Sequence, residues 1–434
     1  MQTRFVLSIS ILCLSALAAC TPPAPPTPVP ASLQPPAQPT AALLPTPSSQ
    51  PLDTPVVALT LPTPTSAPFP SLMNIRMFSQ QNGWAITNDG GLLHTQDGGL
   101  TWTQAAPSGV TAAGGTFFLD DLHAWFSSSQ AAQAAPAAGT LYRTADGGKT
   151  WQTFTMPFQE GLFQFLDANN GVAAADMGAA AGNLYFRMFR TTNGGQTWDL
   201  MHIKNPYGFD EVFPTSMPSG TIHVTSGDEF KFQDASTIWF GGGGIVSSKY
   251  ADLYVSPDAG LTWKHLQLPL PEQKADSGAP VVVDLPTFFN PMDCLFAARY
   301  EGAASPSDNP YSSLYLATYV THDGGSTWEV NPGLLKGVDN LDKVDFISLS
   351  DAFVPCGDNL CATHDGGKTW QTISSNLHFL SGQERILGAW NFADARTGWA
   401  AINLPDGSSV QIYKTTDGGA NWSLLQTQVT ASIR

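Results

Sequence analysis

Short apolar runs alternate with polar turn sequences along most of the chain, and the pattern repeats. One recurring segment has the form Phe-x-Asp-x-x-x-Gly-Trp-Ala, as in residues 392–400. A second segment of the form T/S-x-D-G-G-x-T-W follows it, as in residues 144–151. Apolar runs of this length, bounded by Gly, Asp and Asn, are typical of short strands joined by tight turns. Each pair of segments therefore predicts four short antiparallel strands.

The second segment occurs seven times, with an Asp or Asn in its turn and a Trp at its end. The Asp carboxylate can accept N–H bonds inside the turn, and the glycines can adopt the positive φ that a tight hairpin needs. The Trp offers a large apolar surface to a neighbouring sheet. We predict structural roles for these turn and Trp residues, which are Asp97, Trp102, Asp146, Trp151, Asn193, Trp198, Asp258, Trp263, Asp323, Trp328, Asp365, Trp370, Asp417 and Trp422.

The first segment also recurs seven times, and its Phe is followed by an apolar residue six or seven places later. We assign the Phe position to Phe78, Phe118, Phe165, Phe232, Phe289, Phe346 and Phe392. The later apolar position is filled by Trp84, Trp125, Val172, Trp239, Leu295, Phe353 and Trp399. Eleven of the twelve tryptophans fall in these two repeat positions, which indicates core packing and not a cofactor site.

Seven four-stranded units that cannot bury both faces alone predict an all-β, seven-bladed propeller over residues 71–434. A degenerate unit or an extra strand would make six or eight blades. Because the first unit has its own first strand and the last its own fourth, we expect little or no strand exchange where the ring closes.

The combined repeat resembles the Asp-box (BNR-like) propellers, and it is most similar to the photosystem II stability and assembly factor family. The resemblance covers residues 74 to about 425. Related repeats occur in sialidases, xyloglucanases and sortilin, so the motif specifies a fold better than a function. The resemblance implies that the Asp box is an architectural turn, away from the binding face. The chain lacks the arginine patch of photosynthetic members, and its arginines are scattered.

The N-terminus has a different composition from the repeats. Arg4 precedes an apolar stretch that ends in Leu17-Ala18-Ala19-Cys20, which resembles a bacterial lipobox. We predict a signal peptide over residues 1–19 and acylation of Cys20, although an ordinary signal peptide would also fit. Residues 20–70 hold half of the prolines and predict a disordered linker. The expected location is the outer face of a bacterial membrane in the cell envelope, with the lipid as the only membrane contact.

Composition and charge exclude several classes of function. A formal net charge of −16 with only 19 Lys and Arg residues argues against nucleic-acid binding, which needs clustered cations.

The cysteines predict a disulfide. Cys356 and Cys361 flank a turn sequence between two apolar runs, so they should face each other across a hairpin. Their spacing does not fit a C-x-x-C metal or redox motif. Neither the histidines nor the Asp-Gly-Gly turns have metal-ligand spacing, and we expect no metal or cofactor.

The lengths of the connections suggest where a ligand would bind. The turns inside the two repeat segments barely vary and should share one side of the ring, whereas the other connections vary greatly. The long ones are residues 199–230, 264–286, 299–313 and 371–385. We expect these to form a variable face that binds a protein or glycan, with neutral drift as the alternative. The candidate binding residues are Tyr207, Asp210, Glu211, Arg299, Tyr300, Glu301, Glu384 and Arg385.

Two functions follow from this sequence. The first is a monomeric, non-catalytic scaffold that binds a protein, because no G-x-S-x-G, H-E-x-x-H or glycine-rich phosphate loop is present and we identify no catalytic residue. The second is a glycoside hydrolase or carbohydrate-binding propeller. The early Arg-Ile-Pro element of sialidases is missing, but a mechanism with two carboxylates stays open because their separation cannot be read from sequence.

Overall fold

The computed structural model describes most of the repeat region. Its described residues are 69–112, 114–128, 138–159, 161–180, 183–203, 230–242, 252–258, 262, 264–272, 280, 282–301, 314–338, 343–381, 384–404 and 410–430. The predicted signal peptide, Cys20 and the linker lie outside these residues, as do Tyr207, Asp210, Glu211 and Trp263. Within the described ranges, no helix is long and apolar enough to cross a membrane.

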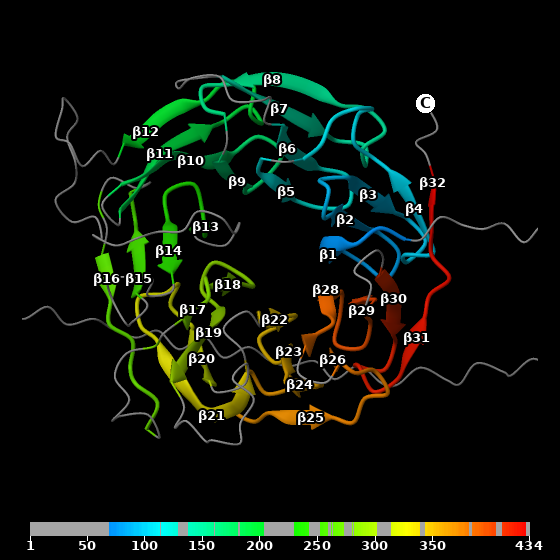
Figure 1. The fold of residues 1–434 in the computed structure, drawn as a ribbon. Helices are drawn as coiled ribbons and strands as arrows, with labels where there is room; N and C mark the ends of the chain where they lie inside the picture. Colours follow the sequence, from blue (N-terminus) through cyan, green and yellow to red (C-terminus); the bar gives the residue numbers. More distant parts are fainter. Residues whose placement is uncertain are drawn as a thin grey trace, which may run out of the picture. The chain divides into compact units, whose positions relative to one another are not determined.

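The described strands form seven four-stranded antiparallel blades arranged in a ring, so the predicted propeller is confirmed (Figure 1). Blades 1 to 3 consist of β1 (Leu72–Met77), β2 (Gly83–Thr87), β3 (Leu92–Thr95) and β4 (Thr101–Gln104); β5 (Thr116–Phe118), β6 (Ala124–Ser128), β7 (Gly139–Thr144) and β8 (Gln152–Met156); and β9 (Gly161–Phe165), β10 (Gly171–Ala180), β11 (Asn183–Thr191) and β12 (Asp199–Ile203).

The remaining blades follow in sequence order around the ring. Blades 4 and 5 consist of β13 (Phe230–Phe232), β14 (Ile238–Gly242), β15 (Asp252–Ser256) and β16 (Lys264–Leu266); and β17 (Val282–Val283), β18 (Thr287–Phe288), β19 (Cys294–Glu301), β20 (Leu314–Thr321) and β21 (Glu329–Val338). Blades 6 and 7 consist of β22 (Asp345–Phe346), β23 (Ala352–Cys356), β24 (Asn359–Thr363) and β25 (Gln371–Ile373); and β28 (Leu387–Phe392), β29 (Gly398–Asn403), β30 (Val410–Thr415) and β31 (Trp422–Leu424). In blade 5, β17 and β18 both pair with β19 and together make the first strand.

Ring closure differs in one respect from the expectation. Each blade keeps its own four strands, but β32 (Gln428–Thr430) pairs in parallel with β4 and adds a fifth strand to blade 1. The outermost strand of a blade leaves a row of backbone N–H and C=O groups unpaired, and the chain end after β31 supplies partners for them on β4. The N–H of Val410, at the start of β30, also donates to the carbonyl oxygen of Phe69, which precedes β1, at 3.3 Å.

The last residue of each first strand occupies an equivalent position, which we call the anchor. Every anchor pairs with the residue six places later, and the anchors are Met77, Phe118, Phe165, Phe232, Phe288, Phe346 and Phe392. The sequence assignment of Phe78 and Phe289 to this position is therefore wrong by one residue. Met77 is apolar but not aromatic, and Phe288 and Phe289 are adjacent, so the search for Phe chose the wrong neighbour.

The core lies between blades, and at the first two interfaces the anchor contacts the residue seven places after the preceding anchor. Trp84 stacks on Phe118 with 5.3 Å between ring centroids, and Trp125 stacks on Phe165 at 3.9 Å. Trp84 and Trp125 are fully buried. Burial of aromatic rings at each blade interface, about 25 cal/mol per Å² of apolar surface, is the main stabilising contribution that the repeat provides.

Candidate functional site

The Asp turn, between the third and fourth strands, is closed by hydrogen bonds from its own side chains. In blade 5, Oδ1 of Asp323 accepts the Thr321 hydroxyl at 2.8 Å and the Thr327 N–H at 2.9 Å. Its Oδ2 accepts the Thr327 hydroxyl at 2.7 Å. The hydrogen bonds from Thr327 lower the pKa of Asp323 to about 2. The carboxylate therefore serves the turn and is not a free ligand.

The first turn of each blade, between its first and second strands, is capped in a similar way. The residue two places after the anchor accepts hydrogen bonds from the N–H groups two and three residues further on, as in an Asx turn. The capping residues are Ser79, Asp120, Asp167, Asp234, Asn290, Ser348 and Asp394.

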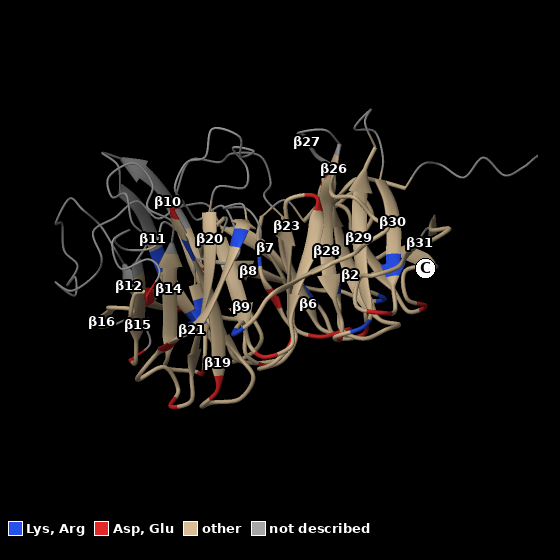
Figure 2. Ribbon diagram, turned by 90° about the horizontal axis from the view of Figure 1, so that it is seen from below, with Lys and Arg blue, Asp and Glu red and all other residues tan. Residues whose placement is uncertain are grey.

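The first turn and the Asp turn of a blade are hydrogen-bonded to each other. The N–H of Gly98, a residue with φ of +75°, donates to the carbonyl oxygen of Gln81 at 2.8 Å. The same bond recurs at Gly147, Gly194, Gly324, Gly366 and Gly418. Both turns therefore lie on one side of the ring, which we call the turn face, and acidic positions follow this edge in Figure 2. The opposite side, where the second strand meets the third, is the variable face.

Two of the candidate binding residues lie in the core and not in a surface loop. Arg299 and Tyr300 are the sixth and seventh residues of β19, and both are fully buried. Nη1 of Arg299 donates to Oδ1 of Asp284 at 2.6 Å, and the hydroxyls of Tyr300 and Tyr319 are hydrogen-bonded. Strands β19 and β20 extend eight residues each, further than the apolar pattern indicated, so the expected loop begins only after the exposed Glu301.

A second group of candidate residues lies on a small hairpin between blades 6 and 7. Glu384 and Arg385 form β27, which pairs with β26 (Leu380–Ser381) on the variable face. The carboxylate of Asp358, from the turn between β23 and β24, holds the chain that leads into this hairpin. Its Oδ1 accepts the N–H groups of Phe379 and Leu380 at 2.9 and 2.8 Å, and its Oδ2 lies 2.6 Å from Nδ1 of His378.

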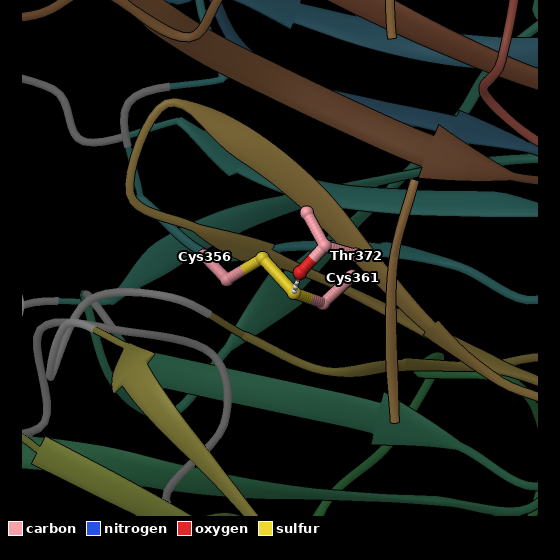
Figure 3. Close-up of a disulfide and its surroundings, with 3 residues drawn as sticks. All are labelled: Cys356, Cys361 and Thr372. Atoms are coloured by element: carbon pink, nitrogen blue, oxygen red, sulfur yellow. Dashed lines mark hydrogen bonds between the residues drawn. A yellow bond between two sulfur atoms is a disulfide. The ribbon is translucent and has the colours of Figure 1, made fainter. Parts of the chain in front are cut away.

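A disulfide braces the turn that carries Asp358. Cys356 and Cys361 are joined across the hairpin of β23 and β24, with 5.8 Å between their Cα atoms. Figure 3 shows the bond beside Thr372, whose hydroxyl lies 3.7 Å from Sγ of Cys361. Together the disulfide, Asp358, His378 and the hairpin β26–β27 form a defined element that we call the corner. Its polar groups His378 and Asp358 are partly exposed.

Sequence reasoning missed a third feature, at the residue before each anchor. Successive N–H groups of a strand point to opposite sides. The N–H of the residue after the anchor bonds toward the second strand, as the N–H of Leu166 does to the carbonyl oxygen of Asn170. The N–H of the anchor itself therefore points away from the second strand. This N–H is met by a side chain from the preceding blade. That side chain belongs to the residue one place before the anchor of the preceding blade. Thus Gln164, Asp345 and Asn391 accept the N–H groups of Phe232, Phe392 and Met77 at 3.0, 2.7 and 2.7 Å.

The residues at this position lie at one level around the ring axis, and we call them the axial belt. They are Arg76, Phe117, Gln164, Lys231, Thr287, Asp345 and Asn391. Figure 1 shows their strands, β1, β5, β9, β13, β18, β22 and β28, around the middle of the ring. Six of the seven side chains are polar, a signal that becomes visible in the sequence only once the anchor register is correct.

The axial belt contains three charged groups, and Arg76 influences both of the others, Lys231 and Asp345. Burial, together with a smaller effect of the Arg76 charge, lowers the pKa of Lys231 to about 8. Burial raises the pKa of Asp345, while the Phe392 N–H and the Arg76 guanidinium oppose that rise.

Comparisons with known proteins find similarity in fold. No protein-family model and no curated protein sequence matches the chain. A structure titled YCF48 bound to D1 peptide is 14% identical, covers 81% of this chain and 93% of its own, and has a TM-score of 0.43. YCF48 from Cyanidioschyzon merolae is 15% identical, with 81% and 94% coverage and a TM-score of 0.44.

A xyloglucan-degrading enzyme is also among the similar structures. The GH74 xyloglucanase from Xanthomonas campestris is 13% identical and covers 84% of this chain, with a TM-score of 0.47. The match spans 55% of that enzyme.

Proposed function

We propose that this chain is a lipid-anchored scaffold that binds a protein partner on its variable face and catalyses no reaction. The observation that supports it is the contrast between the two faces. On the turn face, the described turns are short and closed by their own side chains. On the variable face, the second and third strands of blades 3 and 5 extend by three to five residues beyond those of blade 1, and blade 6 carries the braced corner.

The corner suits a protein partner because its shape is fixed before binding. The disulfide and the hydrogen bonds of Asp358 restrain a projecting element, so little conformational entropy is lost when a partner contacts it. A standard protein interface needs about 800 Å² from each partner, which one face of a propeller can offer. A small glycan would need a cleft, and the corner is a projection.

The environment of the Asp345 carboxylate argues against the enzymatic alternative. A raised pKa is what a general acid needs. However, its Oδ2 already accepts two hydrogen bonds, from the Asn391 amide and the Phe392 N–H, and these join the first strands of blades 6 and 7. We expect no turnover of fluorogenic sialosides or xyloglucan oligosaccharides by the full chain. Turnover that Asp345→Asn abolishes would reverse this part of the proposal.

The partner can be tested with two matched histidine variants. His378 lies on the variable face, 2.6 Å from Asp358, and His322 lies on the turn face, 2.6 Å from Asp293. Their side chains are 69% and 66% exposed, so the two environments are alike. We expect envelope proteins captured by the wild-type full chain to be lost with His378→Glu and retained with His322→Glu.

The outcome of this pull-down is decisive in either direction. Equal retention by both variants, together with retention when Glu384→Arg is added, would place the contact away from the corner and refute this choice of surface. Loss with His322→Glu alone would place the partner on the turn face.

The anchor is tested separately through Cys20. We propose acylation at this residue because it follows an apolar stretch ending in Leu17-Ala18-Ala19. Cys20→Ser should abolish incorporation of labelled palmitate and move the protein from the membrane fraction to the soluble fraction. Incorporation that survives the substitution would refute lipid attachment at this position, while the pull-down result would still stand.

A further inference from the structure

The axial belt contains two cations that lie in no close ion pair with a described carboxylate. Arg76, from β1, is exposed, and its guanidinium lies over the Phe78 ring at 5.3 Å. Lys231, from β13, is partly buried and donates only a long hydrogen bond, 3.4 Å, to the hydroxyl of Thr287. Neither forms an ion pair with a described residue. This differs from Arg299 in the same protein, which is paired with Asp284.

The two cations come from opposite sides of the ring and influence one another. Blade 1 supplies Arg76 and blade 4 supplies Lys231, and the lowered pKa of Lys231 reflects burial first and the Arg76 charge second. The belt holds two positive charges and one carboxylate, Asp345, which interacts with Arg76. One positive charge is therefore left without compensation, which is unfavourable. A partly buried lysine without an anion is therefore an unusual choice for a purely structural position.

The remaining belt residues are already committed to the fold. Gln164, Asp345 and Asn391 satisfy the backbone N–H groups of three neighbouring anchors, which fixes their side chains. The belt thus has a rigid polar part and two cations that are free to bind. This is the arrangement that a preorganised ligand site requires.

We propose that Arg76 and Lys231 together bind the oxyanion of a small molecule, a carboxylate or a phosphate, on the ring axis. The planar guanidinium of Arg76 can hold two oxygens of such a group, and the ammonium of Lys231 can approach the same group as a point charge. The carboxylate of Asp345 stands beside the site and accepts hydrogen bonds, so a hydroxyl on the ligand could donate to it.

The turn-face acids define the direction from which the ligand arrives. The first turns place the carboxylates of Asp120, Asp167, Asp234 and Asp394 beyond the anchors, between the belt and the solvent on the turn face. An anion approaching from that side meets negative charge, which disfavours entry through the turn face. This inference does not depend on a protein partner.

The test is calorimetric titration of the full chain with inorganic phosphate, D-glucuronate and D-glucose. Phosphate and glucuronate distinguish the two sources of oxyanion, and glucose is the neutral counterpart of glucuronate. We expect at least one of the two anions to bind with Kd below about 1 mM and glucose not to bind. Arg76→Gln and Lys231→Gln should each weaken that binding about tenfold or more, since each removes a charge-assisted contact.

Two further variants keep the test interpretable. Arg396→Gln removes an exposed arginine from a first turn on the turn face and should leave affinity unchanged. Asp345→Asn keeps an oxygen acceptor for the Phe392 N–H but removes the negative charge, so it should tighten phosphate binding. Failure of both anions to bind below about 10 mM, or wild-type affinity in folded Arg76→Gln and Lys231→Gln proteins, would overturn the proposal. So would weaker phosphate binding in Asp345→Asn.

Discussion

The Asp turns show whether the turn residue acts through the position of its polar atoms or through its negative charge. In blade 3, Asn193 replaces the aspartate, and its Oδ1 still accepts the Thr191 hydroxyl and the Thr197 N–H, both at 3.0 Å. Its amide then donates to the Thr197 hydroxyl at 2.8 Å, so the direction of one hydrogen bond is reversed. The turn therefore needs two correctly placed polar atoms and not a negative charge.

This comparison predicts different effects for two substitutions of Asp323. Asp323→Ala removes three hydrogen bonds and leaves the Thr327 N–H without its partner, so we expect a loss of about 1–2 kcal/mol in the free energy of unfolding. Asp323→Asn should cost less than half as much, because Asn193 achieves the same geometry. Chemical denaturation at pH 7 measures both. Equal losses would show that the charge matters more than the geometry.

Lys231 should reduce the stability of the unliganded protein. Burial lowers its pKa from 10.5 to about 8, so between pH 8 and 10.5 the unfolded state binds more protons than the folded state. Stability from this group therefore rises as pH increases through that window. At pH 7, we expect Lys231→Met to stabilise the protein by about 1–2 kcal/mol, less than the full shift implies because the side chain is only partly buried.

The control for this prediction is Lys149→Met. Lys149 is an exposed lysine in the Asp turn of blade 2, and its substitution should change stability by less than about 0.5 kcal/mol. Thermal melting without added phosphate compares the two variants. A destabilised Lys231→Met protein would mean that the lysine contributes to packing or hydrogen bonding more than its charge costs.

At the scale of elements, the sequence predicted the repeat to within one residue. Phe and Trp at near-fixed spacing predicted blades and their cores, because aromatic burial constrains both spacing and residue type. Met77 carries no aromatic signature, so the register of blade 1 shifted by one and Arg76 was not recognised as part of the axial belt. Similarly, Arg299 and Tyr300 looked like loop residues, because a buried ion pair leaves no apolar pattern in the sequence.

The added strand β32 is an element that sequence could not predict, since its residues are polar or exposed and carry no repeat motif. The strand contributes through backbone pairing, because Gln428, Val429 and Thr430 pair with β4. We expect a chain ending at Thr427 to melt several degrees lower than wild type, and its β4 amides to exchange faster with deuterium.

A chain ending at Thr430 provides the matched control, because it removes the same terminus but keeps β32. It should melt like wild type. If both truncations lower the melting temperature equally, the stabilising contacts lie beyond residue 430 and not in the pairing with β4.

At the scale of the whole molecule, the Asp turns link stability to pH through many blades at once. The side chain and N–H of Thr327 lower the pKa of Asp323 to about 2, and those of Asn421 lower the pKa of Asp417. Carboxylates with pKa values below that of the unfolded chain contribute stability above about pH 4, and this contribution is lost as pH falls through the folded values. Since the turns are spread around the ring and each blade packs on its neighbours, the losses add in one structure.

We therefore predict a steep loss of stability between about pH 4 and pH 2, caused by protonation of the Asp turns. The double variant Asp323→Asn, Asp417→Asn should be slightly less stable than wild type at pH 7 but lose less stability on acidification, because the amides keep the turn geometry and do not titrate. Denaturation curves at pH 7, 4 and 3 measure this difference. Parallel pH profiles for the two proteins would show that acid sensitivity arises elsewhere, since only these two turn carboxylates differ between them.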